Sequence, residues 1–527
     1  MNTMLTQNTV STIFSTMKRK LITAISIFIY TVIITSCNPE DFIKNPDAET
    51  DEVTKTELAS DYEWDETTVK TITFNGALIR TSSKDVTINN DTATITAGGY
   101  YRISGNLTDG QLVINAPKKL IKIELNGASV SNSTTSPFYI KSATKVILFL
   151  KSGTVNTFTD ASAYSNTSGA NATISSEAYL GFTGEGTLTV SGNYNDGISC
   201  DDPIVIKSGK VNVTAKDDAI RSKDYVVVHG GEITASGVTG HALKSDSTGN
   251  AKFGYIKIDG GNFNLSSSLG DGIHAYKNLI IEDGTFNITS DDSQALRSDS
   301  AITISGGTIN VTNSKQGIEC PYIVISGGTS SFSTSKATIN ATYGNSPTAA
   351  DNSLLVVSGG KLIVSSASNA LVSDGNIKIS GGTTIIQGPS STSKLMAKYL
   401  GEFTVNGGTF IGCGPNAGTK IQGFSVASTQ NNILIKSSSI GTNLFSILDS
   451  GGNPLVAFKP VKTSYYVLFS SPALTAGSNY SIYTGGSYSG GTNTYGYMTD
   501  GSYSTAGATL KTTATLSLSG TVNSITF

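Results

Sequence analysis

A short unit repeats through the middle of this chain, and the repeat constrains the fold more than any other feature. Each copy has a polar residue followed by Gly or Ala and by Ile or Leu, then a short apolar segment, a glycine turn and a second apolar segment. The copies begin at Asp196, Asp218, His241, Asp271, Gln294, Gln316 and Asn369. They are 22, 23, 30, 23, 22 and 53 residues apart, and the last gap contains one degenerate copy. Self-similarity at this period is typical of a solenoid of stacked coils.

The apolar segments of the repeat predict strands. They are rich in Val, Ile and Thr, and no long stretch has a helical period. Identical strand–turn–strand units at a fixed period favour parallel coils, in which each strand pairs with its copy one coil further on. The Gly-Gly pairs allow the positive φ that a sharp corner needs. We therefore predict an all-β fold: a right-handed single-stranded parallel β-helix of about 22 residues per coil, with a C-terminal β cap.

The N-terminal segment has the layout of a secretory signal. Lys18-Arg19-Lys20 precedes a largely apolar run at 21–36, which ends in Ile34-Thr35-Ser36-Cys37 and resembles a bacterial lipobox. We predict a lipoprotein signal peptide over 1–37 and lipidation of Cys37. An ordinary signal with a chance cysteine is the alternative. The lipid would anchor the protein to the outer membrane, at the surface of a bacterial cell.

Three regions follow the predicted signal peptide. Residues 38–70 are rich in acids and lack periodicity, which predicts a flexible tether. The predicted β-helix occupies 71–412. Over 413–527 the period fades and Tyr becomes frequent, so we predict a β-rich cap on the last coil. The alternative for this region is a platform on which tyrosines stack against sugar rings.

The net charge and the cysteine positions argue against a nucleic-acid partner and against a disulfide between Cys200 and Cys320. The formal charge is −3, and beyond the N-terminal segment there is no basic cluster, so nucleic acid is a poor candidate partner. Cys200 and Cys320 occupy the same position of the repeat, five coils apart, which places them roughly 24 Å from each other at about 4.8 Å per coil. A disulfide needs Cα atoms within about 7 Å. We therefore predict two buried thiols in a column of small residues.

Aligned copies bring acidic side chains together at one corner of the coils. Carboxylates about 4.8 Å apart on neighbouring coils repel unless a cation lies between them. Ca²⁺ takes oxygen ligands at about 2.3–2.6 Å and can bridge them. The acids that fit this geometry are Asp196, Asp201, Asp202, Asp217 and Asp218. The alternative is a polar corner whose side chains accept hydrogen bonds from local backbone N–H groups.

A second column carries cations in four consecutive coils. Its members are Arg221, Lys244, His274 and Arg297. Uronate carboxylates recur at a fixed spacing, and Arg can clamp a carboxylate through two hydrogen bonds, so the column predicts an acidic polysaccharide as ligand. The alternative is a row of surface cations paired with nearby aspartates. The chain has only three histidines and shows no convincing catalytic constellation.

The run SGNYNDGISCDDPIVIKSGKVNVTAKDDAIRSKDYVVVHGGEITASG resembles the calcium-binding β-helix carbohydrate-binding proteins that polysaccharide-using bacteria secrete. GGYYRISGNLTDGQLVINAP upstream and YYVLFSSPALTAGSNYSIYTGG downstream extend the resemblance. It implies a pectate-lyase-like shape, bound Ca²⁺ and affinity for cellulose or pectic polyuronate. It also adds Asp271 to the implied calcium ligands. His241 and Gln294 stand where the family tends to repeat Asp, which weakens the expectation of calcium in the later coils.

These observations predict a non-catalytic, calcium-dependent polysaccharide-binding lipoprotein that acts as a monomer. Two alternatives remain. One is a polysaccharide lyase in which Ca²⁺ neutralises a uronate and Arg221 or Lys244 removes the α-proton. The other is a structural adhesin that binds a protein or the surface layer.

Overall fold

The computed structural model describes residues 56–165, 169–246, 252–517 and 521–527. The predicted signal peptide, Cys37 and the first part of the predicted tether lie outside these residues. The described chain is all-β apart from three short 3-10 helices, η2 (Ala59–Tyr62), η3 (Glu66–Thr68) and η4 (Gly418–Lys420). Within these ranges, no helix has the length and apolar character needed to span a membrane.

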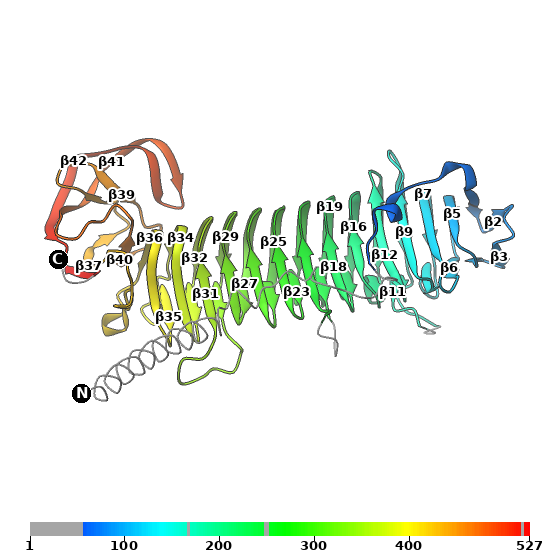
Figure 1. The fold of residues 1–527 in the computed structure, drawn as a ribbon, viewed down its shortest axis with the longest axis horizontal. Helices are drawn as coiled ribbons and strands as arrows, with labels where there is room; N and C mark the ends of the chain where they lie inside the picture. The colour runs from blue at the N-terminus through cyan, green and yellow to red at the C-terminus, as the bar shows by residue number, and fades with distance from the viewer. Residues whose placement is uncertain (1–55, 166–168, 247–251, 518–520) are drawn as a thin grey trace, which may run out of the picture. The chain divides into compact units, whose positions relative to one another are not determined.

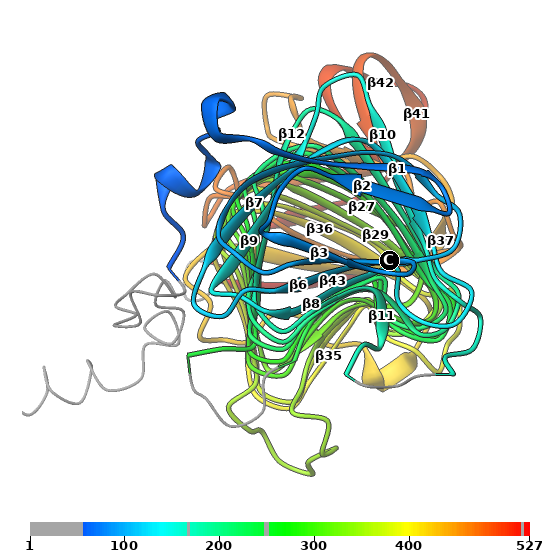
Figure 2. The ribbon, with the colours of Figure 1, turned by 90° about the vertical axis from the view of Figure 1, so that its right-hand side faces the viewer.

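In the described chain, 39 strands form one large, mostly parallel sheet. Its regular part consists of three columns in which each strand pairs in parallel with the strand one coil later (Figures 1 and 2). The first column begins with β11 (Ala172–Ser176), β14 (Asp196–Cys200), β17 (Ile220–Ser222), β20 (Leu243–Ser245) and β23 (Ile273–Ala275). The second begins with β12 (Tyr179–Gly184), β15 (Ile204–Ile206), β18 (Tyr225–Val228), β21 (Tyr255–Ile258) and β24 (Asn278–Ile281). The third begins with β10 (Val155–Thr159), β13 (Thr187–Gly192), β16 (Lys210–Ala215), β19 (Glu232–Gly237) and β22 (Asn262–Ser267).

The columns continue through later coils with some strands fused. β25 (Thr285–Ser298) and β27 (Thr308–Cys320) each run through the third column and on into the first. They are therefore much longer than the three-residue strands β17 and β20 of the first column. The degenerate copy hidden in the 53-residue gap is β30 (Ile339–Ala341), which pairs with β27 and with β33 (Leu371–Ser373).

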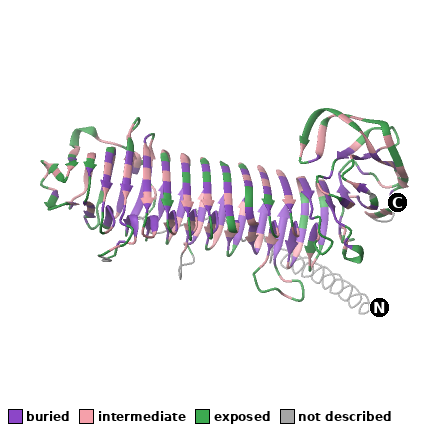
Figure 3. Cartoon of the chain, turned by 180° about the vertical axis from the view of Figure 1, so that it is seen from behind, coloured by how far each residue is buried: buried purple, intermediate pink, exposed green. Residues whose placement is uncertain are grey.

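The predicted parallel pairing of each copy with the next is confirmed, and it builds the core. Ile198 pairs with Ile220, and Ile220 with Leu243, and all three side chains are buried. Phe263 and Phe286 stack in the third column with ring centroids 4.5 Å apart. Burying each such side chain contributes about 1.5–3 kcal/mol. Figure 3 shows the resulting alternation of buried and exposed residues along the strands.

Close stacking of the coils explains the glycines at the corners. Gly231 has φ +100°, and a Cβ there would lie 2.7 Å from the carbonyl oxygen of Gly209 in the preceding coil. Gly197 follows the polar residue of its copy, and a Cβ there would lie 2.2 Å from Val213. Both positions therefore exclude a larger residue, one through φ and contact and the other through contact alone.

The predicted column of small residues around the cysteines is confirmed. Cys200 pairs with Ser222, and Cys320 with Ala341, and all four side chains are buried. Both cysteines are free thiols. Burial raises the pKa of Cys320 to about 12 and raises that of Cys200 as well, so neither thiol is ionised at neutral pH.

The last part of the predicted tether is packed against the sheet, so the prediction of a flexible segment over 38–70 is wrong for the described residues at its end. Asp61 is buried and forms an ion pair with buried Lys145, with Nζ and Oδ2 2.6 Å apart. Trp64 lies edge-on to Tyr100 at a centroid distance of 5.3 Å. The acidic composition predicted disorder because sequence alone does not reveal these distant partners.

The C-terminal region covers the end of the coils. β36 (Phe403–Gly414), β37 (Asn432–Gly441), β40 (Ser464–Ser470) and β43 (Val522–Thr526) continue the large sheet with antiparallel pairs among them. A second sheet closes on itself through β38 (Phe445–Leu448), β39 (Pro454–Phe458), β42 (Tyr497–Thr515) and β41 (Asn479–Thr494). Tyr466 and Tyr480 are buried, so these two rings belong to a packed cap and not to an exposed platform.

Candidate functional site

The repeated polar residues form a ladder along one corner of the coils, which we call the corner ladder. Four consecutive members of the ladder accept a hydrogen bond from the backbone N–H of the copy that follows. The bonds run from Asp218 to Asp196 at 3.2 Å, His241 to Asp218 at 2.8 Å, Asp271 to His241 at 2.8 Å and Gln294 to Asp271 at 3.0 Å. The structure therefore supports the alternative interpretation of the corner, with the N–H donors one coil away and not local.

Three acids of the corner converge into an acidic cluster. Oxygen atoms of Asp196, Asp217 and Asp218 lie within 4.8 Å of one another. Burial, together with the charge of Asp218, raises the pKa of Asp196 to about 7. A Cβ on Gly240 would lie 2.4 Å from Oδ1 of Asp218 and 2.5 Å from Oδ1 of Asp217, so only glycine leaves room for these carboxylates. The cluster offers oxygen ligands alone, and its crowded carboxylates fit Ca²⁺.

The other predicted calcium ligands lie apart from the acidic cluster. Asp201 is exposed and forms an ion pair with a lysine at 2.6 Å. Asp202 is partly buried and is not a member of the cluster. Asp271 instead converges with His241 and His274, whose nitrogens and its own carboxylate oxygen lie within 4.8 Å of one another. The repeat alignment does not separate Asp271 from the acidic cluster, because Asp271 occupies the same position of the repeat as Asp196.

The predicted column of cations is present in register. Arg221 pairs with Lys244, Lys244 with His274 and His274 with Arg297, on neighbouring strands. Nearby aspartates, however, form ion pairs with Arg221 and Lys244. Arg221 lies 2.8 Å from Asp246, and it also lies 3.4 Å from Asp196 and 3.7 Å from Asp218.

Lys244 and His274 have similar partners. Nζ of Lys244 lies 3.1 Å from Oδ2 of Asp218. His274 lies 3.6 Å from Asp271 on one side and 3.6 Å from Asp299 on the other. For these positions the structure favours the alternative of cations paired with aspartates.

Arg297 differs from the other three members of the column. Its side chain is 38% exposed, compared with 21% for Arg221 and 22% for Lys244. Its contact with Asp299 is long, at 3.6 Å from Nε to Oδ1. Of the four predicted ligand-binding residues, Arg297 is therefore the one best able to reach a ligand.

Arg297 opens onto a hollow of about 270 Å³. The hollow is lined by Arg297, Ser298, Asp299, Glu319, Cys320, Pro321, Thr342, Tyr343 and Gly344. Tyr343 is 46% exposed and lies edge-on to Tyr322, with centroids 5.9 Å apart. Gln316 and Asn340 donate to Glu319 at 2.8 and 3.2 Å and hold its carboxylate in place. The hollow thus combines a guanidinium, a fixed carboxylate and an accessible aromatic ring.

The repeat does not predict Tyr343. It lies in the excursion between β30 and β31 (Leu354–Val357), where the repeat carries no signal. An aromatic residue inside an excursion from a solenoid is the one available hint, since such excursions often build a binding face.

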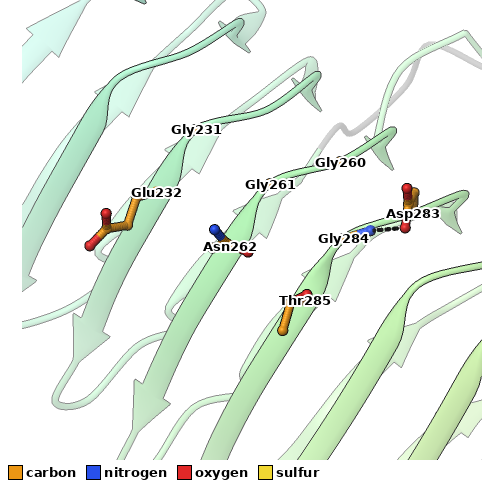
Figure 4. A pocket seen from close by; sticks show the side chains of 8 residues that line it. All are labelled: Gly231, Glu232, Gly260, Gly261, Asn262, Asp283, Gly284 and Thr285. Atoms are coloured by element: carbon orange, nitrogen blue, oxygen red, sulfur yellow. Dashed lines mark hydrogen bonds between the residues drawn. The ribbon is translucent and has the colours of Figure 1, made fainter. Parts of the chain in front are cut away.

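A second hollow, of about 460 Å³, lies along the glycine corners (Figure 4). Its lining includes Gly231, Gly261 and Gly284. The charged groups in its lining are Glu232 and Asp283, and no aromatic residue lines it. The described residues that line it include no cation, so it offers no partner for a uronate carboxylate.

A surface hollow that joins an aromatic ring to charged groups is a candidate binding site. The family model of the carbohydrate-binding domain-containing proteins matches residues 89–341 and 301–391, which together span more than half of the chain. This chain belongs to that family.

Two individual proteins are similar to parts of the chain. A carbohydrate-binding domain-containing protein of Acetivibrio thermocellus is 36% identical over 126 residues, which cover 23% of this chain and 44% of that relative. The match therefore spans less than half of the relative's length. The solved structure of the polysaccharide lyase-like protein from C. thermocellum, a gadolinium derivative, has 24% identity and a TM-score of 0.42, with 49% of this chain and 96% of that chain covered.

Proposed function

We propose that this protein binds an acidic polysaccharide and does not cleave it. The observation that carries the proposal is the hollow in which Arg297, Glu319 and Tyr343 meet. A guanidinium can hold a uronate carboxylate through two hydrogen bonds. A tyrosine ring offers a flat apolar face to a sugar ring and a hydroxyl group at its edge. Membership of the carbohydrate-binding family supports the same conclusion.

The proposal has further parts that concern the whole protein. The parallel columns support a right-handed single-stranded parallel β-helix as the frame of the binding surface. The lipobox-like sequence supports a lipid anchor at Cys37, which would display a monomeric protein on the bacterial surface. Pectic polyuronate is the favoured ligand because the hollow contains Arg297, and cellulose is the neutral alternative.

We also propose that the acidic cluster binds Ca²⁺. Asp196, Asp217 and Asp218 would hold the ion, and water or glycan oxygens would complete the six to eight ligands that Ca²⁺ takes. The bound ion would neutralise the crowded carboxylates. It would also weaken the ion pair between Arg221 and Asp196. Arg221 belongs to the same column of cations as Arg297.

A lyase that uses Arg221 as its base is disfavoured. Burial lowers the pKa of Arg221, but its hydrogen bond to Asp246 and the charges of three aspartates raise the pKa above the usual value. A guanidinium that is held charged cannot accept the α-proton of a uronate. Nζ of Lys244 already has Asp218 as its partner, at 3.1 Å.

Affinity electrophoresis in gels that contain polygalacturonate tests the proposal. Loss of a charged hydrogen-bond partner costs about 1.5–3 kcal/mol, so we expect Arg297→Gln to weaken binding about tenfold or more. We expect Tyr343→Ala to weaken binding as well. A chelator and Asp217→Asn should each reduce the affinity of the otherwise intact protein. Lys361→Gln, which removes a cation at the start of a third-column strand, is the matched control.

The results of these experiments distinguish polysaccharide binding at the hollow from retention by net charge, from an adhesin and from a lyase. Equal losses for Lys361→Gln and Arg297→Gln would show that net charge, and not the hollow, determines retention. If neither polygalacturonate nor a panel of glucans retards the unmodified protein, the polysaccharide proposal is wrong and an adhesin becomes the better hypothesis. Release of unsaturated, ultraviolet-absorbing products from polygalacturonate would contradict the non-catalytic part.

A further inference from the structure

We propose that His241, His274 and Asp271 form a binding site for a divalent transition metal ion such as Zn²⁺. Nε2 of His241 lies 3.5 Å from Nδ1 of His274, and that nitrogen lies 3.6 Å from Oδ2 of Asp271. His274 belongs to β23, while His241 and Asp271 lie two residues before β20 and β23, next to the acidic cluster. The site is distinct from that cluster because it includes two imidazole nitrogens.

An unpartnered oxygen points to a cation at this place. Asp271 is fully buried, and its Oδ2 accepts no hydrogen bond from any residue that the structure describes. Two coils earlier, the corresponding oxygen of Asp218 lies 3.1 Å from the ammonium group of Lys244, which belongs to the coil after Asp218. Relative to Asp271, the position of that lysine is occupied by Arg297, whose ion-pair partner among the described residues is Asp299 and not Asp271. A buried carboxylate oxygen without a donor is costly, and a bound cation would remove that cost.

The donor set selects the type of metal. Imidazole nitrogens suit Zn²⁺, Co²⁺, Ni²⁺ and Cu²⁺, whereas Ca²⁺ takes oxygen ligands. Tetrahedral ligands about 2.0–2.1 Å from Zn²⁺ lie roughly 3.3–3.4 Å from each other, close to the two separations found here. Oδ1 of Asp299 lies 3.6 Å from Nε2 of His274, where a carboxylate commonly orients a metal-binding imidazole.

One hydrogen bond competes with the metal. The backbone N–H of Asp271 donates to Nδ1 of His241, which places the proton of the neutral ring on Nε2. Binding a metal through Nε2 moves this proton to Nδ1 and breaks the bond from the amide. We therefore expect weaker binding than at a site whose ligands are all free.

Titration with Co²⁺ tests the site directly. The complete protein, without a polyhistidine tag, is stripped of metal with a chelator and titrated at neutral pH. We expect one equivalent of Co²⁺ to bind with the visible absorption of nitrogen- and oxygen-ligated cobalt. Zn²⁺ should displace the Co²⁺, and an excess of Ca²⁺ should not.

Two variants remove ligands with little disturbance of the fold. His241→Asn eliminates Nε2 but keeps an acceptor for the amide, because Asn369 in the same ladder accepts the amide of Leu395 at 2.8 Å. His274→Gln removes the second nitrogen at a partly exposed position. Each variant should lose the cobalt absorption and keep the thermal midpoint of the unmodified apoprotein within a few degrees. His229→Gln, which alters the remaining histidine, should keep the absorption.

Three outcomes would overturn the site. The first is the lack of stoichiometric binding by the unmodified protein, and the second is loss of the absorption in His229→Gln. The third is retention of the absorption by both His241→Asn and His274→Gln. Asp217→Asn, which disables the acidic cluster, should leave Co²⁺ binding unchanged. Failure of the calcium proposal and failure of the transition-metal proposal are therefore distinguishable.

Discussion

A single carboxylate at the corner of the coils serves both the fold and the candidate site. Oδ1 of Asp218 accepts the backbone N–H of His241, while Oδ2 faces Lys244. Asp196 has the same arrangement, with one oxygen on the next amide and the other on Arg221. Because one residue performs both functions, replacing it by Ala would alter stability and binding together. Substitutions that separate the two functions are therefore more informative.

Asn369 isolates the structural function of the corner ladder. It lies in a later coil, away from the acidic cluster, and its Oδ1 accepts the amide of Leu395 at 2.8 Å. An amide that loses its acceptor costs about 1–3 kcal/mol, so Asn369→Ala should lower the thermal midpoint, which calorimetry measures. Asn369→Asp keeps an acceptor and should lie much closer to the unmodified protein. Equal midpoints for the two variants would show that the ladder bond contributes nothing.

The sequence predicted some of these residues and not others, for identifiable reasons. The repeat alignment places Asp196 and Asp218 on adjacent coils, because register in a solenoid follows from the period. The same alignment correctly places Arg221 beside Lys244. Side-chain direction is not fixed by the period, so ion pairs with nearby aspartates were one of two alternatives and the partner of each cation could not be identified. Tyr343 lies outside the repeat, and no periodic argument reaches it.

At the scale of elements, the segment before the sheet shows how composition can mislead. Residues 56–69 include two 3-10 helices, and their fixed position depends on a few distant partners. The buried ion pair of Asp61 with Lys145 is one of them. Another is His229, whose ring lies 2.9 Å from Glu57 and 2.7 Å from Asp259. A single titrating group thus links this segment to the second column.

His229 makes the attachment of this segment sensitive to pH. The hydrogen bond to Glu57, with a further contribution from Asp259, raises the pKa of His229 in the folded protein above its usual value. A raised pKa stabilises the attached state below the unfolded pKa of about 6.5, and this contribution is lost as the pH rises through the folded pKa. Amide exchange in residues 57–64, corrected for intrinsic rates, should therefore become faster at alkaline pH. His229→Gln should remove this dependence, and an unchanged pH profile in that variant would contradict the assignment.

At the scale of the whole molecule, the period predicted how the coils pair but not where the regular pattern changes. Parallel pairing of successive copies follows from the repeat and is confirmed from β13 to β23. The excursion before β31 depends on how many residues the chain has between β30 and β31. The fusion of strands in β25 and β27 depends on backbone hydrogen bonds that continue through the corner. The pairing partners of β37, β40 and β43 depend on contacts that no repeat encodes. The hollow lined by Arg297 and Tyr343 lies beside one of these irregular places, so the repeat predicted the position of the cation and not that of the tyrosine.

The C-terminal region should be required to keep the protein from self-associating, because it covers the last coil. Ile411 of β36 packs in one buried cluster with Ile433 and Phe469, which belong to the strands that follow. A chain that ends at Gly414 would expose this surface, and each large apolar side chain so exposed loses about 1.5–3 kcal/mol of burial. We expect that variant to self-associate, as measured by light scattering after gel filtration. Deletion of the mostly exposed residues 345–349 is the control and should leave the particle size unchanged. If the shortened chain stays dispersed but no longer binds polysaccharide, the region contributes to the binding surface, and its tyrosines become candidate sugar contacts after all.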